Sequence, residues 1–325
     1  MEGILALFLL RKNKKSPIII YRREIMIQNY IGSSETTREP PFYSFDFANY
    51  IKYHRPEHKC KEDISTTTHF LEWFIGFAEG DGCFEYRLEK GRPRLSFTIV
   101  QKDSQLLYKV KKSLGFGSVS KHRNYLRFWV DDKRGIQRLQ SIFNGNLVLP
   151  KRRIQFENWV NFKKEVQHST FFFYNRPLMP TLKTAWLSGF VEAEGCFYVR
   201  LSKKPTGFRI TSQKLTITQT DTHGEREILK HINNLFEGSG NLYLAKSPNC
   251  FRIEINNLKC HKIVVEYFQH FGLKGKKHIA YFRWWRIYLM RLDNVHLLEA
   301  NQKKLQRLCQ NLNNSLTKTL FLFSL

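Results

Sequence analysis

The chain has 325 residues, 42% of them hydrophobic, and it contains 53 lysines and arginines against 28 aspartates and glutamates. A net charge of +25 at pH 7 exceeds what solubility requires and indicates a polyanionic partner; we favour nucleic acid over a membrane surface because no long basic amphipathic helix carries the charge. The length suggests about two domains, and the six cysteines include no C-x-x-C pair, which is typical of free thiols in a reducing compartment.

Residues 1–66 show no sustained helical or strand period, so we interpret them as an N-terminal extension of unknown role. The apolar run from Gly3 to Leu10 is shorter than the ~20 residues that cross a bilayer. Basic residues follow this run instead of preceding it, which is the wrong order for a secretory signal. We therefore expect no membrane association from this segment.

An apolar segment that begins with tryptophan, Trp73 to Phe84, is repeated from Trp186 to Phe197 with seven identical positions. Small residues stand four apart in each copy, so on a helix they form a stripe almost without side chains. Two such helices can pack more closely than the usual ~8–10 Å between axes. The glycines that close the copies, Gly82 and Gly195, predict helix ends in the left-handed conformation. The residues predicted to form the helix interface are Gly76, Gly80, Gly189 and Ala193.

Asp81 and Glu194 take the same place in the two copies, directly before the closing glycine. Packed helices would bring these carboxylates together, and their repulsion would be relieved by metal ions, which in pairs promote phosphodiester displacement. A plain core helix pair would also explain the glycines, but it does not explain matched acids. A membrane helix pair is disfavoured because Glu72 and Glu79 interrupt the first run.

Alternating apolar and polar side chains follow each motif, which predicts antiparallel strands with one polar face. Each half is therefore expected to be α-β-β-α-β-β-α, in an α+β fold whose two pseudo-symmetric halves each contain a curved antiparallel sheet. We expect residues 67–167 to form the first half, residues 168–180 a linker, and residues 181–325 the second half with a C-terminal helical tail.

The polar face of such a sheet can lie in a DNA major groove, although an ordinary solvated face shows the same alternation. The residues predicted to contact DNA are Glu85, Arg87, Glu89, Arg94, Ser96, Thr98 and Arg127 in the first half, and Tyr198, Arg200, Ser202, Lys214, Thr216, Thr218 and Arg252 in the second.

The two motifs resemble those of the double-motif LAGLIDADG homing endonucleases, whose namesake sequence is matched by Phe74 to Gly82 and by Leu187 to Gly195. The likeness extends over about residues 67–295. It implies two saddle-shaped sheets on duplex DNA, joined at the two motif helices. It also implies that Asp81 and Glu194 are the catalytic acids and metal ligands, assisted by the carbonyls of Gly80 and Ala193.

The resemblance further implies supporting catalytic residues where the halves echo each other. Gln101 and Gln219 follow the second strand of each half, and Lys151 and Lys276 each stand eight residues before a tryptophan. The same lysines would serve equally well to bind phosphates, so both interpretations remain open.

The family resemblance implies a monomeric endonuclease that depends on Mg²⁺ (or Mn²⁺) and cuts both strands of a long, asymmetric double-stranded DNA site. One alternative is an intron-encoded RNA maturase that assists splicing of its own group I intron RNA without cutting DNA, and another is a non-catalytic DNA-binding regulator. The presence of both acids favours the nuclease. By analogy with the family we expect a mitochondrial, organelle-encoded protein, with the chloroplast as the alternative.

Overall fold

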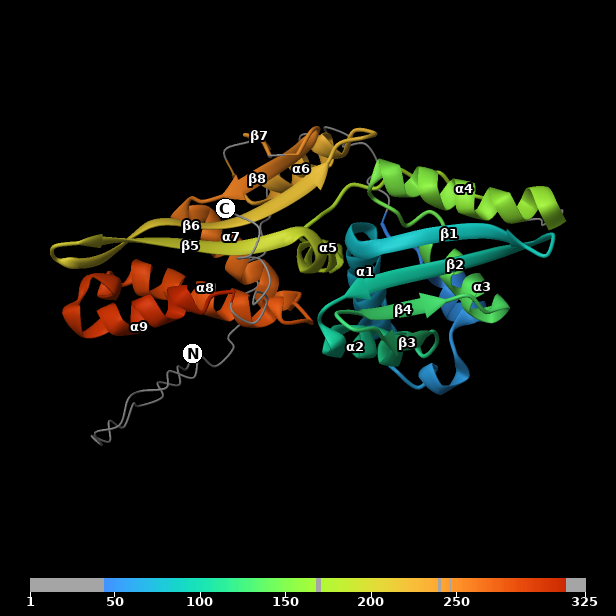
Figure 1. Cartoon of the computed structure of the whole chain (residues 1–325), viewed down its shortest axis with the longest axis horizontal. Helices are drawn as coiled ribbons and strands as arrows, with labels where there is room; N and C mark the ends of the chain where they lie inside the picture. Colours follow the sequence, from blue (N-terminus) through green and yellow to red (C-terminus); the bar gives the residue numbers. More distant parts are fainter. Residues whose placement is uncertain (1–43, 168–170, 239–240, 246, 314–325) are drawn as a thin grey trace, which may run out of the picture. The chain divides into compact units, whose positions relative to one another are not determined.

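The computed structural model describes residues 44–167, 171–238, 241–245 and 247–313. The two motif segments form α1 (Ile64–Asp81) and α5 (Trp186–Glu194), and each opens a half with the same order of elements (Figure 1). The first half continues with β1 (Gly82–Glu89), β2 (Arg92–Gln101), α2 (Ser104–Leu114), β3 (Ser118–Lys121), β4 (Leu126–Val130), α3 (Lys133–Phe143) and α4 (Pro150–Gln167).

The second half repeats this order and adds a C-terminal helix. Its elements are β5 (Gly195–Lys204), β6 (Gly207–Thr220), α6 (Glu225–Leu235), β7 (Tyr243–Leu244), β8 (Cys250–Ile255), α7 (Leu258–His270), α8 (Lys277–Leu292), the 3₁₀ turn η3 (Val295–Leu297) and α9 (Glu299–Gln310). The predicted α+β fold with two pseudo-symmetric halves is confirmed. The expected α-β-β-α-β-β-α order has one helix after each sheet, whereas α3 and α4 follow the first sheet and α7, α8 and α9 follow the second.

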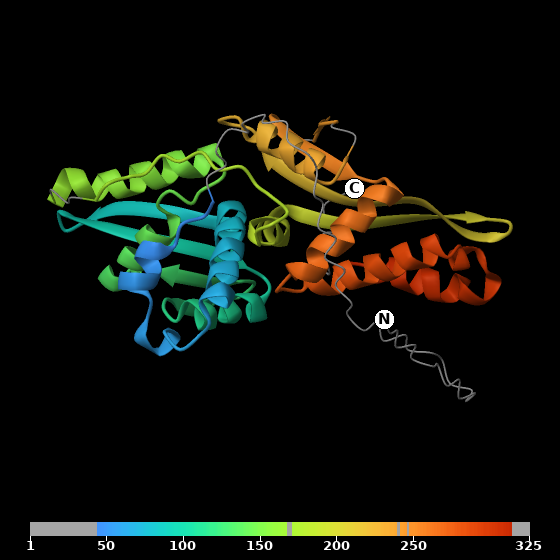
Figure 2. The same cartoon turned by 180° about the vertical axis from the view of Figure 1, so that it is seen from behind.

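Each half contains a four-stranded antiparallel sheet, in the order β1-β2-β4-β3 and β5-β6-β8-β7 (Figures 1 and 2). The second sheet is interrupted, because β6 has an extra residue, Thr211, opposite the step from Arg200 to Leu201 in β5. Such a bulge bends a strand and increases its twist. The side chains of one sheet therefore cannot exactly mirror those of the other.

Aromatic side chains at equivalent positions form the core of each half. Phe84 of β1 lies 5.3 Å from Trp159 of α4 between ring centroids, and Phe197 of β5 lies 5.6 Å from Trp284 of α8. Nε1 of Trp159 also donates hydrogen bonds to the carbonyls of Glu85 (2.9 Å) and Ser96 (3.1 Å), which fixes α4 on β1 and β2.

The small residues of the motifs form the contact between α1 and α5. A Cβ on Gly76 would clash with the carbonyl oxygen of Trp186, and a Cβ on Gly189 would clash with that of Trp73. A Cβ on Gly80 would clash with the side chain of Ala193. The backbones of the two helices thus touch each other, which is possible only because the side chains at these positions are absent or small.

The prediction of left-handed helix ends is wrong. Gly82 has φ −81° and Gly195 has φ −84°, both ordinary for any residue that passes from a helix into a strand. A glycine is needed there because of crowding: a Cβ on Gly82 would lie 2.5 Å from the carbonyl oxygen of Ala78, and one on Gly195 would lie 2.5 Å from Cγ1 of Val191.

The boundary expected at residue 66 falls inside α1, which begins at Ile64. The preceding segment contains the π-helix η1 (Tyr50–His54) and the 3₁₀ turn η2 (Glu57–Lys59), and it contributes buried Phe47 and Tyr50 to the core. Nε of Arg138 in α3 donates to the carbonyl of His54 at 2.9 Å. Residues 44–63 therefore pack on the first half, whereas residues 1–43 of the expected extension lie outside the described residues.

The described part of the expected linker, residues 171–180, forms no helix or strand, and its Phe171 and Phe173 pack against Phe156 of α4. The C-terminal helix α9 buries Leu305, while residues 314–325 of the expected tail lie outside the described residues. Within the part of the chain that the structure describes, no helix is both long enough and apolar enough to cross a bilayer.

Candidate active site at the end of the helix pair

Asp81 and Glu194 are the last residues of α1 and α5, so the close contact of these helices brings them to the same end. Burial, and after it the negative charge of Glu194, raises the pKa of Asp81 to about 6. Burial also raises the pKa of Glu194. The two carboxyl groups thus share one partly desolvated site, in which adding a second negative charge is unfavourable.

Two cations that the sequence interpretation missed lie at this site. Nε and Nη2 of Arg152 donate to the carbonyls of Glu79 (2.7 Å) and Gly80 (2.9 Å). Nζ of Lys277 donates to the carbonyls of Val191 and Ala193, both at 3.0 Å. Each cation therefore binds carbonyls at the end of a motif helix, where positive charge is favourable.

Arg152 and Lys277 also act on the acids electrostatically. The charges of both cations oppose the rise that burial causes in the pKa of Asp81 and of Glu194. Burial lowers the pKa of Lys277, and the neighbouring acids, Glu192 first, counteract this effect. The site thus combines two carboxyl groups and at least two cations in a small, desolvated volume.

The two predicted lysines occupy different environments. Nζ of Lys151 donates to Oε1 of Gln219 at 2.8 Å, and its charge acts on Glu194. The side chain of Lys276 is exposed, and its backbone N–H donates to Oδ2 of Asp103 at 2.8 Å. The structure therefore places Lys277 at the acids in place of Lys276, because Nζ of Lys277 contacts the carbonyls at the end of α5.

The two predicted glutamines also differ in their partners. Nε2 of Gln101 donates to Oδ2 of Asp81. Gln219 is only 5% exposed and accepts hydrogen bonds from Lys151 and from the backbone N–H of Thr220 (3.0 Å). Its Nε2 is buried and has no partner among the described residues. Among the described residues, the amide of Gln101 therefore contacts the acid of its own half, Asp81, whereas the amide of Gln219 does not contact Glu194.

Two buried acids bind the backbone just before the helices that contain Arg152 and Lys277. Glu79 accepts hydrogen bonds from the backbone N–H of Leu149 (2.6 Å) and from Nε1 of Trp186 (2.5 Å). Glu192 accepts from the backbone N–H of Lys274 (2.7 Å) and of Gly275 (3.0 Å). Burial raises the pKa of Glu79 to about 7. A sequence signal for both was available, since this glutamate is one of the identical positions in the repeat.

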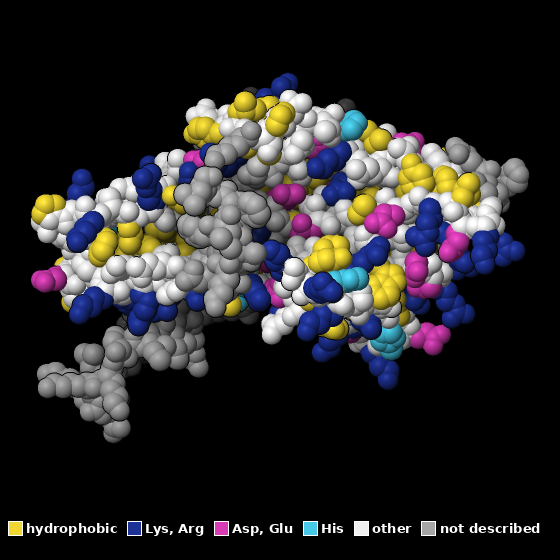
Figure 3. Space-filling model, viewed as in Figure 1, with side chains coloured by type: hydrophobic (Ala, Val, Ile, Leu, Met, Phe, Trp, Pro, Cys, Tyr) yellow, Lys and Arg dark blue, Asp and Glu magenta, His cyan; other side chains and the backbone are white. Residues whose placement is uncertain are grey.

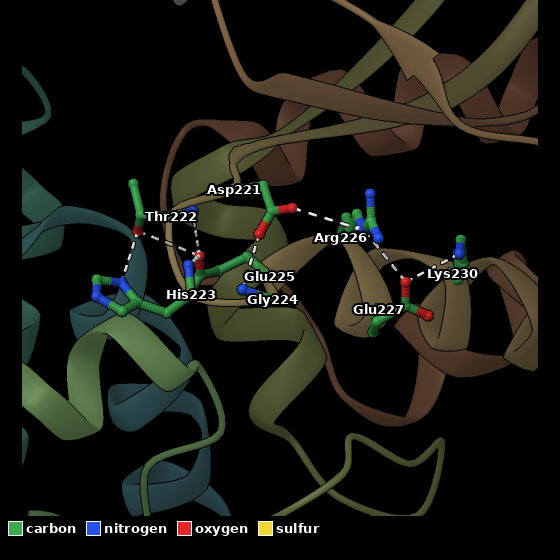
Figure 4. Close-up of polar contacts among 8 residues, drawn as sticks. All are labelled: Asp221, Thr222, His223, Gly224, Glu225, Arg226, Glu227 and Lys230. Atoms are coloured by element: carbon green, nitrogen blue, oxygen red, sulfur yellow. Dashed lines mark hydrogen bonds and ion pairs between the residues drawn. The ribbon is translucent and has the colours of Figure 1, made fainter.

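The start of each late helix is held by an acid of the opposite half. Oδ2 of Asp103 binds the backbone N–H of Lys276, and Oε1 of Glu225 binds that of Lys151 at 2.8 Å. Figure 4 shows the side chain of Glu225 directed at Thr222 and His223, whose backbone N–H groups donate to it at 2.7 and 2.9 Å. These hydrogen bonds overcome the effect of burial and lower the pKa of Glu225.

The predicted DNA-contacting residues of the first half share the sheet face opposite the core, but several are engaged with one another. Glu85 accepts hydrogen bonds from Ser96 (3.3 Å) and Thr98 (3.2 Å), both of which are buried, and pairs with Arg127 at 3.3 Å. Glu89 pairs with Arg94 at 2.9 Å. Arg87 is exposed and forms no ion pair with any described residue.

On the second sheet, Glu254 pairs with both Lys214 (2.7 Å) and Arg252 (3.0 Å). Thr216 is buried and donates to the carbonyl of Cys196 at 3.3 Å. Ser96, Thr98 and Thr216 are thus buried and hydrogen-bonded within the protein, and their contact with DNA stays a prediction. Figure 3 nevertheless shows Lys and Arg spread over the visible face, with fewer Asp and Glu.

The remaining predicted contacts, Tyr198, Arg200, Ser202 and Thr218, lie on β5 and β6. Tyr198 and Arg200 are exposed, with the ring of Tyr198 5.4 Å from Nζ of Lys214, whereas Oγ of Ser202 is buried and has no partner among the described residues.

The ligands that this site offers to a divalent cation are oxygen atoms. Among the described residues, no group of three or more His, Cys, Asp or Glu could hold a metal ion. The carboxylates of Asp81 and Glu194 are the hard oxygen donors that Mg²⁺ prefers, and their mutual repulsion favours a cation near them. The carbonyls of Gly80 and Ala193 already accept hydrogen bonds from Arg152 and Lys277. The donor set therefore fits a divalent cation that is also bound by water and by a phosphate ligand.

The chain is similar to known intron-encoded proteins. The chain is 35% identical over 257 residues to "Probable intron-encoded endonuclease 4" of Neurospora crassa, a match that covers 76% of this chain and 45% of that protein. It is 28% identical over 255 residues to "Intron-encoded RNA maturase bI4" of Saccharomyces cerevisiae, covering 76% and 37%. The chain therefore spans less than half the length of these two relatives.

The fold is similar to that of the LAGLIDADG meganuclease I-AabMI, solved bound to uncleaved DNA. The TM-score is 0.59 at 20% identity, and the match covers 75% of this chain and 99% of the other. The family model described as "LAGLIDADG endonuclease" matches residues 74–163 and 187–288, which include both motifs and more than half of the sequence. The chain therefore belongs to the LAGLIDADG endonuclease family.

Proposed function

We propose that this chain is a site-specific endonuclease that cuts both strands of a long double-stranded DNA site. The observation that carries the proposal is the pairing of Asp81 and Glu194 at one end of the helix pair, where burial and the charge of Glu194 raise the pKa of Asp81. A purely structural helix pair gains nothing from two carboxyl groups at this place. Phosphodiester cleavage, in contrast, would use both carboxyl groups.

Asp81 and Glu194 would hold divalent metal, Mg²⁺ or Mn²⁺, through their carboxylate oxygens. When bound, the metal would supply a Lewis acid for phosphodiester hydrolysis. Arg152 and Lys277 keep positive charge next to the carboxyl groups, and Lys151 adds a further charge near Glu194. These cations would offset negative charge that develops on the phosphate.

Gln101 would orient Asp81, to which it donates a hydrogen bond. Gln219 would instead orient Lys151. The two acids would then cut the two strands from unequal surroundings.

The two sheet faces would read the two halves of the target. Because Arg87 forms no ion pair within the described part of the chain while Arg94 and Arg127 do, we expect Arg87 to be the first of these arginines to contact a base. The faces carry different side chains, so the half-sites should differ. One chain contains both halves and both acids, and it would therefore act as a monomer.

An RNA maturase is the second candidate, because one relative is named an intron-encoded RNA maturase. Its partner would be the chain's own intron RNA. The intron-encoded relatives also support an organellar origin, and we propose that the protein acts in mitochondria.

The test is to incubate the purified chain with DNA of its own locus, lacking the intron, and to map any break. We expect a staggered double-strand break at one site with Mg²⁺ or Mn²⁺, and binding without cleavage with Ca²⁺. Accelerated splicing of its own intron RNA, with no DNA break under any of these ions, would contradict the nuclease and favour the maturase.

A further inference from the structure

A basic hollow lies between the N-terminal segment and α3, away from the acids. It has a volume of about 680 Å³ and is lined by Tyr53, His54, His58, Gly115, Arg134 and Arg138 together with four neighbouring residues. Figures 1 and 2 both show the blue segment that carries η1 beside α3. The hollow exists only because residues 44–63 pack on the first half.

The side chains that line the hollow carry more positive than negative charge. Three arginines and one carboxylate, that of Glu57, line it. Arg134 and Arg138 form no ion pair with any residue that the structure describes. Arg134 and Arg138 stand four apart on α3, so their side chains project from the same face of the helix. Nε of Arg138 donates to the carbonyl of His54, and its guanidinium lies 5.4 Å from the ring centroid of Phe116. Its other amino groups and those of Arg134 can bind a phosphate at this spacing.

An aromatic ring stands at the edge of the same hollow. Tyr53 is 66% exposed, and Nζ of Lys52 lies 4.9 Å from its ring centroid. An exposed ring gains stability when a flat group stacks on it, and nucleobases stack on tyrosine in this way. Phosphate-binding arginines beside a stacking ring suit an unpaired nucleotide better than a simple anion.

The hollow is separate from the surface proposed for duplex DNA. Ile136 and Leu139 of α3 are buried in the core that also contains Phe97 and Phe128 of the sheet. Arg87 and Arg94 are on the other face of that sheet, because neighbouring side chains of a strand point to opposite sides. A duplex lying on the polar faces would therefore leave the hollow accessible.

We propose that this hollow binds a phosphorylated nucleotide of an unpaired strand, with its base stacked on Tyr53 and its phosphate on Arg134 and Arg138. This binding is independent of the proposed cleavage, because it uses none of the residues at the acid pair. The strand is RNA or single-stranded DNA, which present the same base and phosphate to these side chains.

The test uses the full chain and fluorescence anisotropy with a labelled ten-nucleotide RNA, and separately with DNA of the same sequence, in the presence of excess unrelated duplex DNA. We expect Tyr53→Ala to weaken binding about 5- to 100-fold and Tyr53→Phe to preserve it, because stacking needs the ring alone. Arg134→Ala should make the dependence of log K on log salt shallower by about 0.7 for the lost phosphate contact.

Arg286→Ala is the matched control. Arg286 is an exposed arginine of α8 that forms no ion pair with any described residue, so its loss removes the same charge from the other half. We expect it to leave strand binding unchanged within about twofold, given one charge far from the hollow. Thermal melts should show that all of these variants are folded, since Tyr53, Arg134 and Arg286 are exposed.

The source of the nucleotide follows from comparing the strands: tighter binding of the RNA identifies RNA, and equal binding means that the site accepts either. Three results would overturn the proposal. They are no binding of either strand by the wild type, equal binding by Tyr53→Ala and the wild type, and displacement of the strand by inorganic phosphate as readily as by a nucleoside monophosphate. Cleavage of duplex DNA is measured in a separate assay. The result of the strand-binding test therefore does not depend on whether the chain is a nuclease.

Discussion

Nζ of Lys151, in the first half, donates a hydrogen bond to Oε1 of Gln219, in the second half, across 2.8 Å. The backbone N–H of Lys151 is also held by a residue of the second half, Glu225. The positive charge of Lys151, at the start of α4 in the first half, thus lowers the pKa of Glu194 in the second half against the effect of burial. Lys276, which the sequence makes equivalent, is exposed and does not do the same for Asp81.

This asymmetry predicts that the two strands respond differently to mutation. Lys151→Met should slow cleavage by the Glu194 side by about 100-fold, the typical effect of removing one group that stabilises transition-state charge. The strand that is cut on the Asp81 side should still be cut at the usual rate, so nicked DNA should accumulate. A supercoiled plasmid with strand-specific end labels measures both steps.

Lys276→Met is the matched control, because it removes the same charge from the equivalent position without touching the acids. We expect it to cut both strands at nearly the wild-type rate. Equal slowing of both strands by Lys151→Met, or a comparable loss in Lys276→Met, would show that the lysines act in some other way, such as general phosphate binding.

The close contact of α1 and α5 predicts strong intolerance at its glycines. Gly76→Ala or Gly189→Ala places a Cβ against a carbonyl oxygen of the other helix, so the helices must separate. We expect the free energy of unfolding to fall by at least ~1–3 kcal/mol, measured by chemical denaturation. Gly272→Ala is the control, since its Cβ would meet only the carbonyl oxygen of Phe268 at 3.8 Å. Equal stability of all three variants would contradict the close packing.

The raised pKa of Asp81 predicts that its charge destabilises the protein when metal is absent. The pKa is about 6 in the fold against an ordinary 3.8, so the fold binds this proton more tightly than the unfolded chain does. Its contribution to stability is therefore present at low pH and is lost as pH rises from about 4 through about 6. Asp81→Asn removes the charge at every pH.

We therefore expect Asp81→Asn to raise the free energy of unfolding of the metal-free protein by about 1–3 kcal/mol at pH 8 and to change it little at pH 4. Denaturant titrations at the two pH values, in the presence of a chelator, provide the measurement. A variant that is less stable than the wild type by the same amount at both pH values would show that the carboxylate is not under electrostatic strain.

The ion pairs on the first sheet predict which arginine reads the DNA. Arg87→Ala should relax sequence preference in one half-site, with a cost of ~1–3 kcal/mol at the affected base pair if the contact is bidentate. Arg94→Ala should cost less, because Arg94 is already paired with Glu89. Selection of cleavable sites from a randomised library checks both. Relaxation in both half-sites at once would contradict a monomer with two different faces.

Much of this architecture could be predicted from the sequence because it follows from periodicity and repetition. The glycines four apart fixed the helix pair, and the alternation after each motif fixed which side chains share a face. Periodicity does not determine at which residue a helix begins. The sequence therefore predicts Lys276 as the lysine near the acids, whereas Lys277 contacts α5. It also says nothing of an irregular segment, so Phe47 and Tyr50 were not recognised as core residues.

The partners of individual polar groups could not be predicted, since they depend on contacts between distant segments. Gln101 and Gln219 occupy equivalent positions, yet one contacts an acid and the other a lysine. Glu85 shows the same limit: its spacing places it on the polar face of the sheet, but only the folded sheet shows that it engages Ser96, Thr98 and Arg127.

The central claim is that Asp81 and Glu194 together carry out the cleavage. It is tested most directly by measuring cleavage and binding of the mapped target by Asp81→Asn and Glu194→Gln, with Mg²⁺ for cleavage and Ca²⁺ for binding. We predict that either substitution abolishes double-strand cleavage while duplex affinity stays within about tenfold, because each carboxylate ends a motif helix and is not part of a strand. Cleavage at the wild-type rate by the double variant would contradict the account.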